Sequence, residues 1–308
     1  MHRILVTGAS GLLGVNIAYE VSKQYQVIGV TNRLAYQNNE FDLITQDLLA
    51  PGAVEKLINK VEPDWIIHCA ALANLEACEA NPEQARKLNS ELPGKLAAIV
   101  ARGGARLLHV STDAVFDGVH GDYQETDQPN PLSVYAQTKL DGEYAVAEAN
   151  PDAIIARVNL FGWSITGKRS LAEFFYNNLQ DGKTVFGFTD VYFCPLLANH
   201  LANIFIKMLE ANLSGLYHVV SSSSSSKYNF GVEIAQRFGF DATLITPTSV
   251  TQAGLKAARS PNLTLKNDRL KNALGTPLPD IMDGLGRFFT LHQEGYPQKL
   301  RKLCQTQE

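Results

Sequence analysis

A tyrosine and a lysine four residues apart, Tyr135 and Lys139, have the spacing that most directly suggests chemistry in this sequence. Residues i and i+4 share one face of a helix, and a helix is expected over residues 133–149. A phenol has a pKa of about 10, and a neighbouring ammonium favours the phenolate and lowers that pKa. The pair can donate a proton to a carbonyl that is being reduced, and Lys139 can also hold a nicotinamide ribose.

A strand that ends in hydroxyl groups precedes this helix. Residues 107–111, Leu-Leu-His-Val-Ser, are a strand candidate, and Thr112 and Asp113 follow it. Because ligands of doubly wound sheets bind beyond the carboxyl ends of the strands, we expect Thr112 to face the same crevice as Tyr135. Thr112 could then hydrogen-bond the substrate oxygen. Ser111 or Asp113 could support it, although Asp113 could equally shape only the turn.

A glycine-rich turn, TGASGLLG at residues 7–14, follows the first strand and opens a helix. Gly8 permits the tight turn, Gly11 lets the backbone approach a pyrophosphate, and Gly14 lets the helix pack close to the sheet. The helix N-terminus offers unpaired N–H groups and the positive end of its dipole to phosphates. A mere turn is the alternative, but the strand before and the helix after favour a dinucleotide site.

The end of the second strand bears on the choice of dinucleotide. NAD-binding proteins usually place an acid there to hold the ribose hydroxyls, whereas residues 27–30 are followed here by Thr31, Asn32 and Arg33. A guanidinium matches a 2′-phosphate well. The sequence therefore favours NADP(H), with NAD(H) as the alternative and a solvated loop charge as the other interpretation of Arg33.

Two further strand ends lie where a dinucleotide would pass. Asp47 follows the third strand and could accept a hydrogen bond from an adenine amino group, or cap the helix expected near residue 52. Cys69, Ala70 and Ala71 end the fourth strand with small side chains, which would let the backbone lie against the cofactor.

The elements that must position these residues alternate regularly through the first half of the chain. Nearly continuous apolar runs predict strands covered on both faces, and helical patterns separate them. This alternation predicts an α/β fold of the Rossmann type with a doubly wound parallel sheet. The expected strands are 4–6, 27–30, 43–44, 65–69, 107–111 and 154–158, and the expected helices are 11–24, 52–61, 82–102 and 133–149.

The second half is less regular. Helices are expected at 171–179, 197–209, 228–238, 267–274 and 280–292, with a strand at 216–220. Six consecutive serines, residues 221–226, predict a flexible surface loop or, alternatively, a hydroxyl-rich rim of a substrate cleft. The polar residues after 293 predict a frayed tail.

Composition excludes several classes of protein. The 308 residues have a formal net charge of -4 and no basic footprint, so a nucleic acid is not an expected partner. The four cysteines show no metal-ligand spacing, and His68 and His109 lie inside strands, so free thiols, packed histidines and no metal site are expected. The chain shows neither a signal segment nor an apolar run long enough for a bilayer, which predicts a cytoplasmic protein without a membrane partner.

Three motifs together resemble a known family. TGASGLLG, then HVSTDAVFDG, then PNPLSVYAQTKLDGE are similar to the extended short-chain dehydrogenase/reductases, and most similar to the dTDP-4-dehydrorhamnose reductase group. That group includes the regulatory β subunit of methionine adenosyltransferase, which shares much of the pattern. The resemblance covers residues 1–290 approximately and is looser in the C-terminal half.

The resemblance implies a function and a set of site residues. It implies an NADP(H)-dependent reductase of a nucleotide-linked 4-keto sugar, monomeric or homodimeric, with Thr112, Tyr135 and Lys139 as the catalytic residues. Cofactor contacts are implied at Gly8, Ser10, Gly11, Leu12, Leu13, Asn32, Arg33, Asp47, Leu48, Cys69, Ala70, Ala71, Leu72, Asn89, Ser111, Tyr135, Lys139 and Asn159. Substrate contacts are implied at Asp113, Ala114, Val115 and Arg259. Arg157 resembles the family's arginine at a strand end near the nicotinamide.

The resemblance also implies a smaller C-terminal substrate domain. Residues 1–162 and about 192–215 would form the Rossmann domain, about 163–191 and 221–293 the substrate domain, and 294–308 the polar tail. The stretch from Asp190 to Leu196 replaces polar neighbours of Pro195 by apolar ones, and Asn199 and His200 stand where the family tends to have an acid. These departures lie on the substrate side, so they bear on the sugar more than on the redox chemistry.

Two other functions stay open from the sequence. One is a sugar-nucleotide epimerase of the same superfamily, against which Arg33 counts because epimerases recycle a tightly held NAD. A dehydratase is disfavoured, since Ala114 stands where dehydratases carry a glutamate after Thr-Asp. The other is a non-catalytic regulatory subunit that binds NADP.

Overall fold

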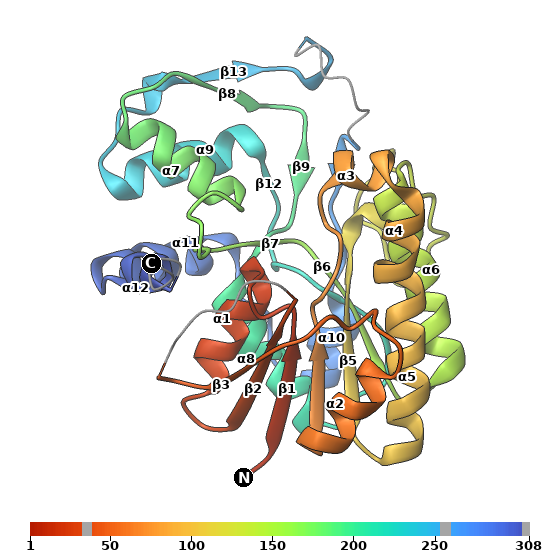
Figure 1. The fold of residues 1–308 in the computed structure, drawn as a ribbon. Coiled ribbons are helices and arrows are strands. Elements are labelled where there is room, and N and C mark those ends of the chain that lie inside the picture. The colour runs from red at the N-terminus through yellow and green to blue at the C-terminus, as the bar shows by residue number, and fades with distance from the viewer. Residues whose placement is uncertain (33–38, 253–259, 304–308) are drawn as a thin grey trace.

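Seven parallel strands form the central sheet of the protein, in the order β11-β6-β5-β4-β1-β2-β3 (Figure 1). The structure is a computed structural model and describes residues 1–32, 39–252 and 260–303. The strands are β1 (Arg3–Thr7), β2 (Gln26–Thr31), β3 (Asp42–Thr45), β4 (Trp65–His68), β5 (Arg106–Thr112), β6 (Ile154–Val158) and β11 (Gly215–Val219). The chain order reverses between β1 and β4, which is where ligands of doubly wound sheets bind. The predicted fold class is therefore confirmed.

Helices cover both faces of this sheet, as the apolar runs of the strands predicted. Successive side chains of a strand point to opposite faces, so Ile4 and Val6 of β1 pack in one core while Leu5 packs in the other. The first core includes α1 (Leu12–Val21) and α8 (Ala198–Glu210), and the second includes α2 (Ala53–Val61), α5 (Leu92–Gly103) and α6 (Val134–Ala149). Figure 1 shows these groups on opposite sides of the sheet.

The helix expected over residues 82–102 is interrupted. It consists of α4 (Pro82–Arg86), a π-helical turn η1 (Lys87–Glu91) and α5, and a helix that was not expected, α3 (Leu75–Ala80), precedes it. Pro93 has no N–H to donate to the carbonyl of Asn89, so the α-helical ladder cannot continue there. The N–H of Leu92 instead bonds the carbonyl of Lys87. The freed Asn89 carbonyl lies against Gly142 of α6, where a Cβ would be 2.1 Å from its oxygen.

A second group of elements lies beyond the carboxyl edge of the sheet, at the top of Figure 1. Strands β12 and β14 pair with β9, and β13 pairs in parallel with β8. Their bounds, with those of the two helices beside them, are α7 (Leu171–Gln180), β8 (Val185–Phe188), β9 (Tyr192–Phe193), β12 (Ser225–Ser226), α9 (Lys227–Phe238), β13 (Ile245–Thr248) and β14 (Asn262–Leu263). Between these elements the chain returns to the main sheet through β10 (Leu196–Leu197), which pairs with β7 (Leu160–Phe161), and then through α8 and β11.

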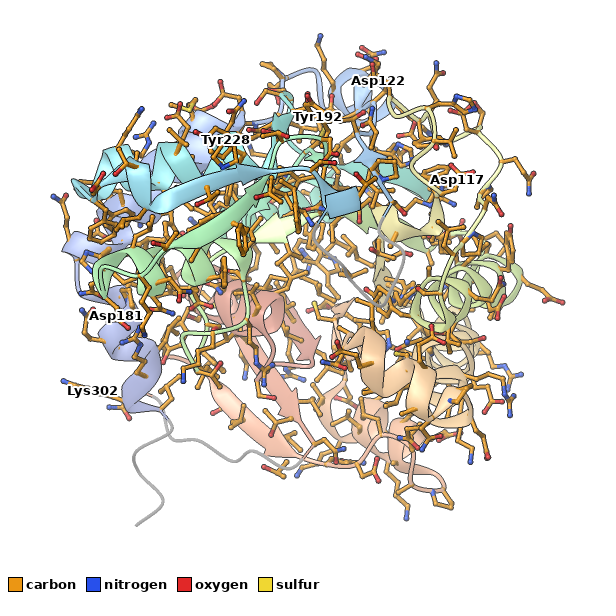
Figure 2. The ribbon with its side chains drawn as sticks, turned by 90° about the horizontal axis from the view of Figure 1, so that it is seen from above. Asp117, Asp122, Asp181, Tyr192, Tyr228 and Lys302 are labelled. Carbon is orange, nitrogen blue, oxygen red and sulfur yellow. The ribbon has the colours of Figure 1, made fainter. Side chains whose placement is uncertain are left out.

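The loop after β5 joins this second group to the carboxyl edge of the sheet. The N–H of Asn262 donates to the carbonyl of Gly118 at 3.0 Å, and the N–H of Asp122 donates to Thr264 Oγ1 at 2.7 Å. Figure 2, seen from above, places Asp117 and Asp122 along this loop. The segment that ends at β14 is therefore anchored close to the end of β5.

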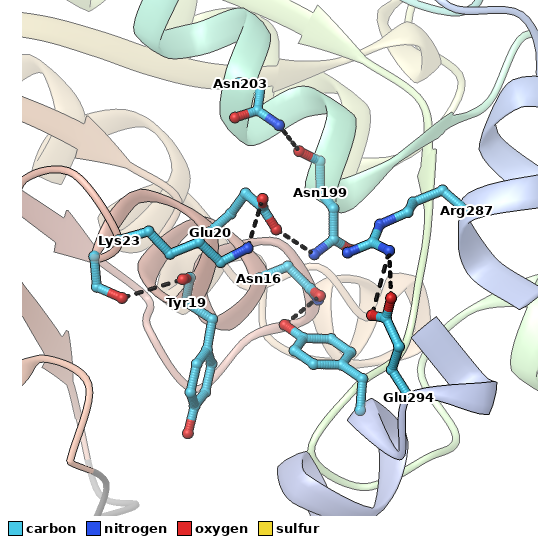
Figure 3. A network of polar contacts seen from close by, with 10 residues as sticks. Asn16, Tyr19, Glu20, Lys23, Asn199, Asn203, Arg287 and Glu294 are labelled. Carbon is cyan, nitrogen blue, oxygen red and sulfur yellow. Dashed lines mark hydrogen bonds and ion pairs between the residues drawn. The ribbon is translucent and has the colours of Figure 1, made fainter. Parts of the chain in front are cut away.

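A frayed polar tail was expected after residue 293, and this prediction is wrong for residues 296–302. They form α12 (Tyr296–Lys302), which follows α11 (Ile281–Gln293), and Leu300 is fully buried. Tyr296 Oη donates to Asn16 Oδ1 of α1 at 3.0 Å. Figure 3 shows the polar contacts around Asn16. Tyr296 and Leu300 lie one helical turn apart, so a single apolar face packs the helix despite its polar composition. None of the helices in the described ranges is both long and apolar enough to cross a membrane.

Candidate functional site

The predicted catalytic side chains meet at the carboxyl edge of the sheet. Thr112 is the last residue of β5, and Tyr135 and Lys139 lie on the first two turns of α6. Ser133 begins that helix, because its Oγ accepts the N–H of Ala136 at 3.2 Å. Thr112 is 7% exposed, and its side chain hydrogen-bonds the phenol of Tyr135. The structure therefore brings Thr112 and Tyr135 together as the strand-end argument predicted.

Burial dominates the acidity of Tyr135. It raises the pKa of the phenol to about 12, and the hydrogen bond with Thr112 opposes that rise only in part. The lowered pKa expected from the Tyr-Lys spacing is therefore wrong for this structure, because desolvation of the phenolate outweighs the favourable contacts. A phenol with a pKa of about 12 keeps its proton throughout the physiological range, and the same shift makes it a weaker acid than a free phenol.

Lys139 is buried, and hydrogen bonds to β5 hold its ammonium group. Its Nζ donates to the carbonyl of Val110 at 2.6 Å and lies 3.4 Å from His109 Nε2. Burial lowers the pKa of Lys139 to about 8, and the carboxylate of Glu143 opposes this shift. An ammonium has three donors, and the described residues provide partners for two of them. The third can serve a ligand.

Two stacked histidines lie beneath this lysine. The rings of His68 and His109 are 5.5 Å apart between centroids, and His68 Nδ1 is 2.8 Å from Thr7 Oγ1. Burial lowers the pKa of His68 to about 3 and holds that of His109 well below its ordinary value. Both rings are therefore neutral, and His109 can accept a hydrogen bond from Lys139. The described residues contain no cluster of three potential metal-ligating side chains.

A buried ion pair links α6 to β6. Arg157 Nη2 donates to Glu143 Oε2 at 2.7 Å, and both side chains are less than 5% exposed. Ser111 Oγ donates to Glu143 Oε1 at 2.5 Å. Ser111, predicted to contact the cofactor, therefore has its hydroxyl directed at Glu143. The guanidinium of Arg157 also lies 5.0 Å from the centre of the Phe116 ring. No sequence signal paired Glu143 with Arg157, because they lie on different elements.

Asp113 and Asn159 form the polar group closest to Thr112. Asn159 Nδ2 donates to Asp113 Oδ2, and Thr112 Oγ1 donates to Asp113 Oδ1 at 3.1 Å. Asp113 is 4% exposed, and burial raises the pKa of its carboxyl to about 6 despite these two hydrogen bonds. Ala114 is half-buried and Val115 is fully buried, so Val115 presents little side-chain surface to a substrate.

The raised pKa of Asp113 predicts a pH dependence of folding stability. A carboxyl whose pKa rises from 3.8 to about 6 on folding binds protons more tightly in the folded state. Its contribution is therefore lost as the pH rises from about 4 to about 6, by at most about 3 kcal/mol. We expect Asp113→Asn to remove this loss, measured as a flatter dependence of the urea unfolding free energy on pH between 4 and 7. Parallel curves for the wild type and the variant would contradict the shift.

The glycine-rich turn has the geometry that a diphosphate requires. Gly8 has φ +69°, and a Cβ on it would lie 2.8 Å from the amide nitrogen of Ala70. A Cβ on Gly14 would lie 2.3 Å from the carbonyl oxygen of Gly8, so helix and turn touch directly. Gly11 begins α1 without a side-chain cap, which leaves the first N–H groups for an anion. Ser10 and Leu12 are half-buried beside it, whereas the side chain of Leu13 is buried.

The end of β4 is tied to the helices behind it. The N–H of Ala70 donates to Thr7 Oγ1 at 3.2 Å. Asn89 is fully buried, and its Oδ1 accepts the N–H of Leu72 while its Nδ2 donates to Leu72 O and to Thr138 Oγ1. The amide of Asn89 thus fixes the loop after β4 against α6. Cys69 is half-buried and Ala71 is exposed, so the small residues of this strand end do border open space.

The predicted adenine end is described only in part. Asn32 is exposed at the end of β2, and Arg33 and Arg259 lie outside the described residues. Asp47 is exposed, with Leu48 half-buried beside it, and Asp47 Oδ1 accepts the N–H of Leu49 at 2.9 Å. The alternative that Asp47 caps the next helix is wrong, because α2 begins after Gly52.

The six serines do not form a single surface loop. Ser225 and Ser226 form β12, and Ser226 Oγ accepts the N–H of Asn229 as the cap of α9. Ser221 is buried, and residues 221–224 line a cavity of about 450 Å³ with Cys194, Lys266 and Lys271. A serine directly before a helical pattern was a readable cap signal, but six identical residues gave no periodicity from which to predict the rest.

The comparisons with known proteins agree with this geometry. Residues 1–293 match the family model described as the RmlD substrate binding domain. The chain is 35% identical over 290 residues to the protein named "Probable low-salt glycan biosynthesis reductase Agl14" of Haloferax volcanii, which covers 91% of this chain and 95% of that protein. It is 31% identical over 281 residues to methionine adenosyltransferase 2 subunit beta of Bos taurus, covering 88% and 82%.

A solved structure gives the same result. The dTDP-4-dehydrorhamnose reductase of Bacillus anthracis in complex with NADP superposes with a TM-score of 0.84 at 25% identity, covering 94% of this chain and 99% of the other. The resemblance drawn from the three sequence motifs is confirmed, both to the dTDP-4-dehydrorhamnose reductase group and to the β subunit. The chain belongs to the RmlD substrate binding domain family.

Proposed function

We propose that this protein is an NADP(H)-dependent reductase of a nucleotide-linked 4-keto sugar. The observation that carries the proposal is the meeting of Thr112 and Tyr135 at the carboxyl edge of the sheet, where the glycine-rich turn also opens. A named reductase and an NADP complex among the similar proteins support it.

The roles of the residues follow from their environments. Bound NADPH would supply a hydride to the keto carbon. Tyr135, which is protonated at physiological pH, would give its proton to the oxygen of that carbonyl. Thr112 would orient the same oxygen through its hydroxyl. Lys139, held by Val110 and His109, would use its remaining donor for the nicotinamide ribose. The buried carboxyl of Asp113 would contact the sugar through Thr112 or directly.

The residues present fit the cofactor. The close contacts of Gly8 and Gly14 leave no room for side chains, and the uncapped start of α1 offers donors for a diphosphate. The test is turnover: purified protein, NADPH and a panel of 4-keto sugar nucleotides, followed by loss of NADPH absorbance and identification of the reduced sugar. Oxidation of NADPH with formation of a reduced sugar nucleotide would support the proposal, and binding without turnover across the panel would oppose it.

A second candidate is a regulatory subunit that binds NADP without chemistry. The 31% identity to methionine adenosyltransferase 2 subunit beta favours it. Under this alternative the protein would bind NADPH, leave all keto sugars unchanged and form a stable complex with a synthetase. The turnover assay separates the two candidates, because a single reduced product excludes a purely regulatory protein.

We expect the preference for NADPH to depend on Arg33. A guanidinium binds a 2′-phosphate bidentately, and NADH lacks that group. Arg33→Ala should raise the Kd for NADPH about tenfold and leave that for NADH within about twofold, as measured by calorimetry. Arg102→Ala, which removes an exposed cation from α5, is the matched control and should change neither. Equal weakening of both dinucleotides by Arg33→Ala would show that Arg33 does not read the 2′-phosphate.

A further inference from the structure

The loop between β7 and α7, residues 162–170, passes over the start of α1. Gly162 faces Leu12, since a Cβ on Gly162 would lie 3.6 Å from Leu12 Cδ1. Asn16 Nδ2 of α1 donates both to the carbonyl of Leu12 at 2.7 Å and to the carbonyl of Trp163 at 2.8 Å. One buried side chain therefore fixes the beginning of this loop to the helix that follows the glycine-rich turn.

A buried carboxylate fixes the other end of the same loop. Glu173 has no exposed surface and accepts the N–H groups of Ser164 at 2.6 Å, Arg169 at 2.8 Å and Ser170 at 3.2 Å. Ser170 Oγ donates to the carbonyl of Gly162 at 2.8 Å and closes the loop. The backbone that carries Arg169 is thus held in one position relative to α1.

The side chain of Arg169 reaches the glycine-rich turn. Its Nη1 donates to the carbonyl of Ser10 at 3.4 Å. In the described part of the chain no carboxylate forms an ion pair with Arg169, whose side chain is exposed. A guanidinium has five donors in a fixed fork, so one long hydrogen bond to Ser10 leaves the rest for an anion. The neighbouring Lys168 is exposed as well, and only its backbone N–H has a described partner, Ser164 Oγ.

We propose that Arg169 binds the diphosphate of the cofactor from the side opposite the start of α1. This inference rests on the proposed dinucleotide site. A diphosphate at the N-terminus of α1 lies beside Ser10, and its charge attracts the guanidinium that Ser10 already holds in place. Arg169 comes from a segment more than 150 residues after the turn, so the contact would also couple cofactor binding to the part of the chain that leads to α7.

The test compares two dinucleotides and two neighbouring cations. Because NADPH and NADH share the diphosphate, Arg169→Ala should raise the Kd of both about tenfold, as measured by calorimetry. Arg169→Lys keeps the charge and loses the fork, so it should recover part of this loss. Lys168→Ala removes an exposed cation one residue away and should change neither Kd more than about twofold. Melting temperatures of all variants within a few degrees of the wild type, as the exposed positions predict, establish that the fold is kept.

Three results would overturn the inference. Kd values unchanged within twofold in Arg169→Ala would mean that Arg169 only links the loop to Ser10. A raised Kd for NADPH with an unchanged Kd for NADH would mean that Arg169 contacts the 2′-phosphate instead of the diphosphate. Equal losses in Lys168→Ala and Arg169→Ala would reduce the effect to general surface charge. A wild-type protein that binds neither dinucleotide would instead overturn the proposed function itself, so the two failures are distinguishable.

Discussion

Tyr135→Phe is expected to lower kcat for reduction of the keto sugar by about 10²- to 10⁴-fold. The change removes only the hydroxyl, so the ring keeps its burial and packing. The pKa of about 12 keeps Tyr135 protonated at any physiological pH. The measurement is steady-state turnover with NADPH, together with the Kd for NADPH from calorimetry.

The Kd for NADPH should stay within about threefold of the wild-type value, because Lys139 and the glycine-rich turn are untouched. Tyr144→Phe is the matched control: Tyr144 lies on the same helix, is 55% exposed and should leave kcat unchanged. A Tyr135→Phe enzyme with full kcat would contradict the proton-donor role. Loss of kcat together with loss of NADPH binding would assign Tyr135 to cofactor binding and leave the proton donor unidentified.

The central sheet could be predicted because strands that are buried on both faces have nearly continuous apolar sequences. Residues 154–158 were predicted as a strand and form β6 with the same bounds, and residues 4–6 lie inside β1. Periodicity alone does not separate a short apolar run from a buried helix segment, but the short length of these runs and their β-branched residues favour strands. The parallel arrangement of the strands then indicated that Thr112 and Tyr135 lie at one edge, since parallel strands share their carboxyl end.

The elements that were missed depend on partners far away in the sequence. Two-residue strands such as β12 and β14 exist only because β9 lies between them, and so short a segment has no periodicity. The π-helical turn at Asn89 had a readable cause in Pro93, but its position against Gly142 needed the fold. Helix α12 was not predicted because its residues are mostly polar, although Tyr296 and Leu300 have the spacing of an apolar helix face.

The positions of the site residues were predicted better than their pKa values and hydrogen-bond partners. The Tyr-Lys spacing correctly placed both residues on one helix, yet spacing alone says nothing about desolvation, which raises the pKa of Tyr135 instead of lowering it. Likewise, Ser111 and Asn89 were expected to face the cofactor, whereas their side chains are bonded inward to Glu143 and to Leu72. The direction of a polar side chain at a strand end depends on its buried hydrogen-bond partners, and the sequence alone does not identify those partners.

Glu143→Leu is expected to destabilise the protein by about 3–5 kcal/mol. The substitution leaves the guanidinium of Arg157 buried without its carboxylate, and removes the acceptor of Ser111 Oγ. Arg157 Nη1 already has no partner in the described ranges, so the remaining protein cannot compensate the charge. The free energy of unfolding in urea, extrapolated to water, is the measurement.

The double variant Glu143→Leu, Arg157→Met separates the charge from the packing. Replacing a buried ion pair by apolar side chains of similar size is often neutral, so the double variant should recover most of the stability lost in Glu143→Leu. Glu83→Ala, which breaks an exposed pair with Lys87, is the control and should cost less than about 1 kcal/mol. Additive losses in the double variant would show that Glu143 acts through packing alone. Recovery of stability without recovery of turnover would show that Glu143 also acts on the site. The reason would be that its carboxylate, one helical turn from Lys139, opposes the lowering of the Lys139 pKa by burial.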